Sequence, residues 1–188
     1  MDTFHPPASD APEVLESRDV YTGRIFTVSV DTVREGEKTY EREVVRHPGS
    51  AAVIAAFDDQ TVALVKQYRH PAVRYSLELP AGSRDMAEKP EECAARELEE
   101  ELGLVARELI PLVEFFVSPG FCAEKMWIFL ALGLEETTQR LEDDELIEVV
   151  RLSWPRVLEM VSDNEIEDAK TMIGLIFAAK HLGIPTEF

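Results

Sequence analysis

Residues 82–104 read GSRDMAEKPEECAARELEEELGL and contain the clearest structural signal of the chain. Pro90 suits the first turn of a helix, where its missing N–H costs nothing, and Gly103 suits a left-handed C-terminal cap. Between them, small and aliphatic residues recur every three or four positions and form one apolar stripe. The sequence therefore predicts a helix over residues 90–102 that packs on a core.

Glutamates crowd one face of this helix. Glu97 and Glu101 are four residues apart, so their side chains lie one above the other, and the same spacing allows an Arg96–Glu100 ion pair. Neighbouring carboxylates repel one another unless they are exposed, paired with a cationic side chain or bound to a metal ion. Carboxylate oxygens suit Mg²⁺ and Mn²⁺, and no His or Cys stands here at ligand spacing for zinc. We expect a solvated face for the remaining glutamates of the helix, Glu91, Glu92 and Glu99.

The stretch resembles the Nudix box, G-x5-E-x7-R-E-U-x-E-E-x-G-U with U an aliphatic residue, at every specified position. Nudix proteins are typically hydrolases of a nucleoside diphosphate linked to another moiety. The resemblance implies an α/β/α sandwich with a mixed sheet, in which the box forms a loop–helix–loop that carries divalent metal ions. It implies metal ligands at Glu97, Glu101 and the backbone carbonyl of Ala81. Glu100 becomes a ligand or a water-activating neighbour, and Arg96 an orienting partner.

Composition limits the other functions. The net charge of −18 argues against a nucleic-acid polymer as partner, although an acidic protein can bind a small diphosphate through a metal ion and local arginines. The longest apolar runs, near 126–134 and 172–179, are too short to span a bilayer. No basic segment followed by an apolar one begins the chain, so we expect no secretory signal and a cytoplasmic location. Cys93 and Cys122 do not suggest a disulfide framework.

The chain reads as one catalytic domain behind a strand-rich N-terminal region. Residues 1–12 hold three prolines, and we expect them to be disordered. Alternating β-rich runs over residues 13–46 predict an antiparallel strand meander. Residues 47–188 would form the Nudix domain, with further strands around the box and helices over 155–162 and 166–182.

Segments outside the box resemble one branch of this family, the ADP-ribose pyrophosphatases. In that branch a proline typically follows the box by about fifteen residues, and Pro119 does so here, between Ser118 and Gly120. The stretches VVRHPGSAAVIA, VKQYRHP, SLELPAG, EDDELIEV and DAKT are also similar to it. In relatives of this branch the N-terminal strands exchange between two subunits, which implies a homodimer here.

The branch resemblance also implies substrate-binding residues. Arg46 and Arg69 would contact the diphosphate or the terminal ribose, because the planar fork of arginine matches phosphate oxygens. Glu78 would bind polar groups of ribose or adenine, or pair with an arginine, and Glu124 would hold ribose hydroxyls in the loop that starts at Ser118-Pro119-Gly120. An aromatic of the N-terminal strands stacks on adenine in relatives, and Phe26 is the matching position, with Tyr21 the other candidate.

In this branch the catalytic base comes from an acidic loop after the box, here residues 141–145. Glu145 is the better-matched acidic position and Glu142 is its neighbour, while Asp143 stands where some relatives carry a catalytic glutamate. The resulting hypothesis is Mg²⁺-dependent hydrolysis of ADP-ribose to AMP and ribose 5-phosphate, with Mn²⁺ as a possible substitute. Two alternatives stay open: hydrolysis of another nucleoside diphosphate sugar or a dinucleotide, and a catalytically silent Nudix module that binds a nucleotide or scaffolds a complex.

Overall fold

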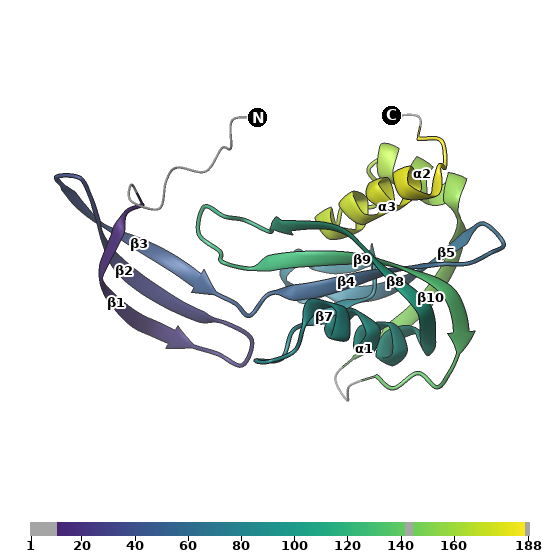
Figure 1. Ribbon diagram of the computed structural model, residues 1–188, viewed down its shortest axis with the longest axis horizontal. Helices are drawn as coiled ribbons and strands as arrows, with labels where there is room; N and C mark the ends of the chain where they lie inside the picture. The colour runs from purple at the N-terminus through teal and green to yellow at the C-terminus, as the bar shows by residue number, and fades with distance from the viewer. Residues whose placement is uncertain (1–10, 142–144, 187–188) are drawn as a thin grey trace. The chain divides into compact units, whose positions relative to one another are not determined.

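The computed structural model describes residues 11–141 and 145–186 of the chain (Figure 1). The chain divides into two compact units. One contains the N-terminal residues up to Pro48 together with Phe116–Glu124, and the other contains residues 49–115 and 125–188. The stretch 1–12, expected to be disordered, lies almost entirely outside the described residues.

The first unit is built on a three-stranded antiparallel sheet of β1 (Glu13–Thr22), β2 (Thr27–Glu35) and β3 (Lys38–Arg46). Gly36, with φ of +59°, makes the tight turn between β2 and β3. This is the predicted strand meander. Every residue of β1 is exposed, whereas alternate residues of β2 are buried.

The second unit contains a seven-stranded sheet in the order β10–β5–β4–β9–β8, with β6 paired to β5 and β7 paired to β4. Its strands are β4 (Ser50–Ala56), β5 (Thr61–Arg69), β6 (Arg74–Glu78), β7 (Ala81–Ser83), β8 (Leu104–Phe116), β9 (Lys125–Glu136) and β10 (Ile147–Ser153). The sheet is mixed, because β4 runs parallel to β9 but antiparallel to β5 and β7.

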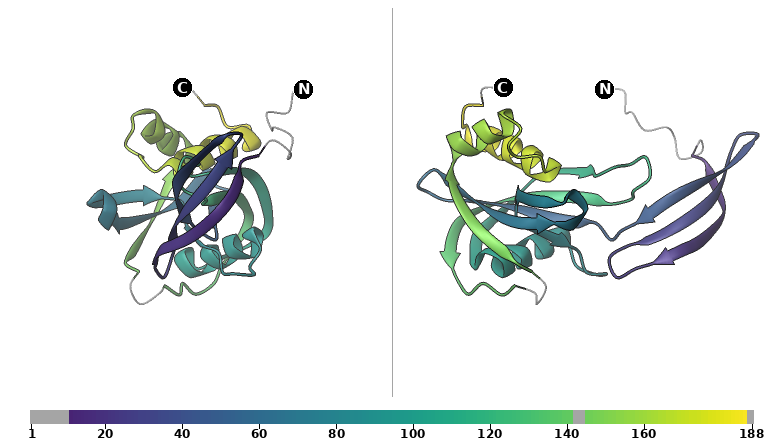
Figure 2. Two further views of the ribbon diagram at one scale, coloured as in Figure 1. Left: turned by 90° about the vertical axis from the view of Figure 1, so that its left-hand side faces the viewer. Right: turned by 180° about the vertical axis from the view of Figure 1, so that it is seen from behind.

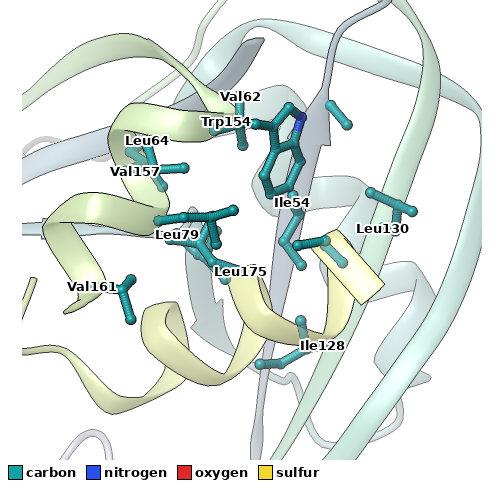
Figure 3. Close-up of a cluster of buried hydrophobic side chains, with 14 of the residues drawn as sticks. Ile54, Val62, Leu64, Leu79, Ile128, Leu130, Trp154, Val157, Val161 and Leu175 are labelled. Carbon is teal, nitrogen blue, oxygen red and sulfur yellow. The ribbon is translucent and has the colours of Figure 1, made fainter. Parts of the chain in front are cut away.

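Helices cover both faces of this sheet. Helix α1 (Pro90–Leu102) lies on one face, and α2 (Trp154–Ser162) and α3 (Ala169–Leu182) lie on the other (Figures 1 and 2). Successive side chains of a strand point to opposite faces, so Val53 of β4 packs into the cluster beneath α1. Its neighbour Ile54 joins Trp154 and Leu175 beneath α2 and α3 (Figure 3). The α/β/α sandwich predicted from the sequence is confirmed.

Two helices begin at other residues than the sequence predicts. Helix α3 begins at Ala169 rather than at residue 166, because the Asp168 carboxylate accepts a hydrogen bond from the backbone N–H of Thr171, 3.0 Å away, and so caps the helix. Helix α2 begins at Trp154 rather than at residue 155. The predicted cap of α1 is confirmed, since Gly103 with φ of +64° ends this helix and β8 begins at the next residue, Leu104. No helix among the described residues is long and apolar enough to cross a membrane.

Candidate active site

Helix α1 directs two glutamates toward the chain segment that precedes it. Its apolar side, with Ala94 and Leu98, is buried against the sheet. The carboxylates of Glu97 and Glu101 are buried as well, with 6% and 3% of the residue exposed. The backbone N–H of Ala81 donates a hydrogen bond to Glu101 Oε2 at 3.3 Å. Two acidic side chains, four residues apart, are thus withdrawn from water beside Ala81.

Gly82 makes room for the carboxylate of Glu97. A Cβ atom at this position would lie 1.9 Å from Glu97 Oε1, well inside the 3.0 Å that real contacts of this kind respect. The first glycine of the box is therefore required by a close approach of backbone and carboxylate, and any larger residue would displace Glu97.

Arg96 connects the glutamates of the box. Its guanidinium donates to Glu88 at 2.9 and 3.2 Å, to Glu97 at 2.6 Å and to Glu100 at 2.9 Å. The predicted Arg96–Glu100 pair is present. Because one guanidinium binds three carboxylates, it orients them, and it ties Glu88 of the loop to the helix.

The two buried glutamates are costly to ionise. Burial raises the pKa of Glu97 to about 7, against the opposing effect of Arg96, with the charges of Glu100 and Glu145 adding to the rise. Burial also raises the pKa of Glu101 to about 8, and the negative charges of Glu97 and Glu145 contribute further. The site therefore favours any added positive charge.

This donor set fits a hard divalent cation. Mg²⁺ is usually bound by one or two protein carboxylates, with waters and substrate phosphates completing its shell. Glu97 and Glu101 can supply those carboxylates, and the Ala81 carbonyl can supply a further oxygen. Over residues 11–141 and 145–186, no group of three or more His, Cys, Asp or Glu side chains is placed so that it could hold a metal ion. Glu97 and Glu100 form ion pairs with Arg96 instead.

The segment after β9 is fastened to the C-terminal turn of α1. The carbonyl of Glu100 accepts a hydrogen bond from the backbone N–H of Arg140 at 3.0 Å, and the carbonyl of Glu101 accepts one from the side-chain amide of Gln139. The Arg140 guanidinium also binds the carboxylate of Glu99 at 2.6 Å. These contacts satisfy carbonyls that a helix end leaves without partners. Glu99, expected on a solvated face, is thus half-buried and paired.

The fastened segment leads into the acidic loop. Glu145 lies close enough to Glu97 and Glu101 for its charge to raise both of their pKa values. Glu145, one of the two candidate bases, therefore lies near Glu97 and Glu101. Glu142 and Asp143 lie outside the described residues.

Arg69 and Glu78 form a bidentate ion pair, with both hydrogen bonds at 2.8 Å. Lys170 binds the same carboxylate of Glu78. Burial alone would raise the pKa of Glu78, but the hydrogen bonds from Arg69 and Lys170 outweigh it and lower the pKa to about 2. Pairing with an arginine, one of the two roles expected for Glu78, is present in the structure. Arg69 stays half-exposed, and the charge of Glu101 acts on it.

Arg46 belongs to the first unit, where it closes a network across three strands. Its guanidinium donates to Ser29 Oγ at 2.9 Å and to Asp31 Oδ2 at 2.6 Å. Asp31 is buried and also accepts a hydrogen bond from Ser17 at 2.6 Å. This hydrogen bond lowers the pKa of Asp31; burial opposes the effect, and Arg46 adds to it. The guanidinium of Arg46 is thereby fixed, while about half of its side chain remains exposed.

The loop with Ser118, Pro119 and Gly120 also belongs to the first unit. It lies against the end of β3, where the N–H of Val45 donates to the carbonyl of Phe121 at 2.8 Å and the N–H of Ala123 donates to the carbonyl of Val45 at 2.9 Å. Glu124 ends this loop with a carboxylate oxygen 4.0 Å from His47 Nδ1.

Phe26 and Tyr21, the two candidate adenine platforms, lie together in the turn region between β1 and β2. Their ring centroids are 5.9 Å apart, and both rings are exposed. Either ring therefore has a face that a base could stack on.

Comparison with known proteins gives this arrangement a family. Residues 46–175, most of the chain, match the NUDIX domain. The chain belongs to the Nudix family.

Individual relatives support the same assignment. The chain is 37% identical to the ADP-ribose pyrophosphatase of Bacillus subtilis strain 168, over 85% of this chain and 88% of that protein. It is 34% identical to the methanol dehydrogenase activator of Bacillus methanolicus, over 87% and 90%. A crystal structure of an ADP compounds hydrolase shares the fold with a TM-score of 0.79 at 24% identity, covering 93% of this chain and 97% of that one. The predicted resemblance to the ADP-ribose pyrophosphatase branch of the Nudix family is confirmed.

Two groups of residues around the Nudix box were missed by the sequence analysis. Gln139 and Arg140, which fasten the acidic loop, follow the box by 35 and 36 residues and carry no motif. Asp168, Lys170 and Thr171 stand in the DAKT stretch, which is similar to the branch but contains no predicted site residue. A helix cap could be suspected at Asp168 from its residue type alone, but the contact of Lys170 with Glu78 depends on the fold.

Proposed function

We propose that the chain hydrolyses the diphosphate of ADP-ribose with Mg²⁺, giving AMP and ribose 5-phosphate. The observation that carries this proposal is the pair of buried glutamates, Glu97 and Glu101, held on a helix in which every box position is filled. The similarity to an ADP-ribose pyrophosphatase over most of both chains supports the choice of substrate.

Glu97 and Glu101 would hold the metal ion, together with the Ala81 carbonyl and, in a supporting position, Glu100. Bound there, Mg²⁺ (or Mn²⁺) would lower the pKa of a bound water and offset negative charge on the phosphate that leaves. Arg96 would keep the carboxylates oriented. Glu145 would accept the proton of the water as it attacks one phosphorus in line, with Glu142 as its neighbour in the same loop.

The substrate contacts follow the expectations from the branch. Arg69, held by Glu78 at the edge of the metal site, would bind phosphate or ribose oxygens through its half-exposed guanidinium. In the first unit, Arg46 and Glu124 would bind the diphosphate and ribose hydroxyls, and the loop from Ser118 through Pro119 to Gly120 would shape the ribose end. Phe26 would provide the surface on which adenine stacks.

We further propose a homodimer in the cytoplasm. Strand β1 is exposed along its whole length and carries large apolar side chains, among them Val14, Leu15 and Val20. A second copy of the chain would cover this surface, which a monomer leaves in contact with water.

The test is a phosphate-release panel. The protein is incubated with Mg²⁺ and ADP-ribose, other nucleoside diphosphate sugars or dinucleotides, and phosphatase then frees phosphate from any monophosphate formed. We expect the highest kcat/KM for ADP-ribose and a loss of several orders of magnitude in Glu97→Gln, whereas the matched control Glu91→Gln, on the exposed side of the same helix, stays active. Faster release from another substrate would replace ADP-ribose, and release from none of them would favour the silent binding module.

A further inference from the structure

Residues 78–81, which lead into the Nudix box, are held by the first turn of α3. Thr171 is fully buried, and its hydroxyl accepts a hydrogen bond from the backbone N–H of Leu79 at 2.8 Å. The same hydroxyl donates to Asp168 Oδ2 at 2.6 Å. One side chain of α3 thus joins the cap of its own helix to a backbone group 92 residues earlier in the sequence.

An ion pair and a packing contact reinforce this connection. Lys170 binds the buried carboxylate of Glu78 and lies 3.0 Å from Asp168. One turn further along α3, a Cβ on Gly174 would lie 2.6 Å from Leu79 Cδ1, so the helix backbone lies directly on the Leu79 side chain. Residues 78 and 79 are therefore fixed by charge, hydrogen bonding and shape.

The fixed segment ends at the metal site. After Leu79, the carbonyl of Pro80 accepts a hydrogen bond from the N–H of Val53 at 3.0 Å, and the N–H of Ala81 binds Glu101. Neighbouring Cα atoms are only about 3.8 Å apart across a peptide bond, so a shift at Leu79 is transmitted to Ala81. Glu78, at the other end, holds Arg69.

We propose that Asp168, Lys170 and Thr171, together called the α3 clamp, are positioning residues of the active site. They act through Glu78 and Leu79 and fix the Ala81 backbone, the Glu101 carboxylate and the Arg69 guanidinium relative to one another. This inference rests on the proposed function, since it assigns the clamp to the metal site of that reaction. It gives the DAKT stretch a physical role that is distinct from substrate contact.

Thr171 is the best position for a test, because its hydroxyl makes both connections. Thr171→Val keeps the shape but leaves the Leu79 N–H buried without an acceptor. Thr171→Ser keeps the hydroxyl and should restore the clamp. Thr61 offers a matched control, since its hydroxyl also joins an aspartate, Asp59, to a donor, Arg151, at the start of β5, where Thr61 pairs with Ser153 of β10.

The experiment measures three quantities for each variant. Hydrogen exchange of the Leu79 amide is followed by NMR in metal-free protein, Mn²⁺ affinity is measured by electron paramagnetic resonance without substrate, and kcat and KM are measured with ADP-ribose and Mg²⁺. In Thr171→Val we expect faster exchange at Leu79, weaker Mn²⁺ binding and a kcat lowered roughly 10- to 100-fold, as a displacement approaching 1 Å would produce. Thr171→Ser and Thr61→Val should behave like wild type in all three.

The outcomes separate the two proposals. If exchange at Leu79 rises while Mn²⁺ affinity and kcat stay at wild-type values, the clamp holds the segment but does not position the site, and the inference is wrong. If wild-type protein hydrolyses no substrate but Thr171→Val still weakens Mn²⁺ binding, the clamp stands and the proposed reaction falls. Should Thr171→Val fail to fold, Gly174→Ala shifts Leu79 by packing instead, and unchanged Mn²⁺ affinity in that variant would equally overturn the inference.

Discussion

A methyl group at position 82 should disable this site while leaving the fold in place. In Gly82→Ala the new Cβ would lie 1.9 Å from Glu97 Oε1 and 2.4 Å from the carboxyl carbon, whereas real contacts stay beyond 3.0 Å. The carboxylate must therefore move by about 1 Å or more. It can do so, because it is the far end of a flexible side chain, and its hydrogen bond with Arg96 must then change as well.

The expected cost falls on catalysis. A misplacement of about 1 Å in a catalytic group can lower the rate about 100-fold, so kcat/KM for ADP-ribose should fall by about that factor. Mn²⁺ binding, measured without substrate, should weaken in parallel, because the moved carboxylate is a proposed ligand. The melting temperature should change little, since no backbone atom is among the nearest contacts of the new Cβ.

Gly36→Ala provides a control with the opposite pattern. Its Cβ would meet no atom within 4 Å, but φ of +59° strains any residue with a side chain. It should lower the melting temperature of the protein and leave turnover unchanged. Wild-type Mn²⁺ affinity and turnover in Gly82→Ala would refute the reasoning, and so would a loss of activity that occurs only because the variant unfolds.

Three further predictions concern acid stability, the acidic loop and the metal. The lowered pKa of Glu78, about 2 against the ordinary 4.5, should contribute about 3 kcal/mol of stability that is complete above pH 4.5 and lost as the pH falls toward 2. Urea unfolding at several pH values should show this loss in wild type and not in Glu78→Gln. Arg140→Ala removes a largely exposed ion pair worth about 0.5 kcal/mol, so the melting temperature should hardly change, yet kcat should fall several-fold and recover in Arg140→Lys. Because the pKa values of Glu97 and Glu101 are about 7 and 8, Mg²⁺ binding should displace protons and tighten as the pH rises through this range. Calorimetry in buffers of different ionisation enthalpy should detect the released protons. A chelator should lower the melting temperature, because it removes the bound ion.

Helix α1 could be predicted from the sequence because its signals are local. Pro90, the apolar stripe and Gly103 define α1 at the residues where the structure has it, and the four-residue spacing places Glu97 and Glu101 together. The strands could also be recognised, since alternation of residue types extends over several positions. Boundaries were less predictable where one side chain decides them, as the Asp168 cap does for α3.

The supporting contacts of the site could not be read from the sequence. Arg140 reaches the end of α1 only because β8 and β9 return the chain there, and Thr171 reaches Leu79 across 92 residues. No periodicity records such pairs, because they depend on how strands are ordered in the sheet. The same holds for Glu78. A sequence can suggest that this glutamate pairs with an arginine, but it cannot show that Lys170 of α3 also binds its carboxylate.

The placement of Phe116–Glu124 among the N-terminal strands has a practical consequence for how this chain can be divided. A protein shortened to begin at Arg46 would keep the whole NUDIX match and the loop with Pro119, but it would lose Val45, whose N–H and carbonyl both bind that loop. Such a shortened enzyme should retain its fold and its metal affinity while losing discrimination among substrates. Strands β1 to β3 therefore support the loop Phe116–Glu124, which follows them by seventy residues in the sequence. A shortened or chimeric protein should keep these strands and this loop together.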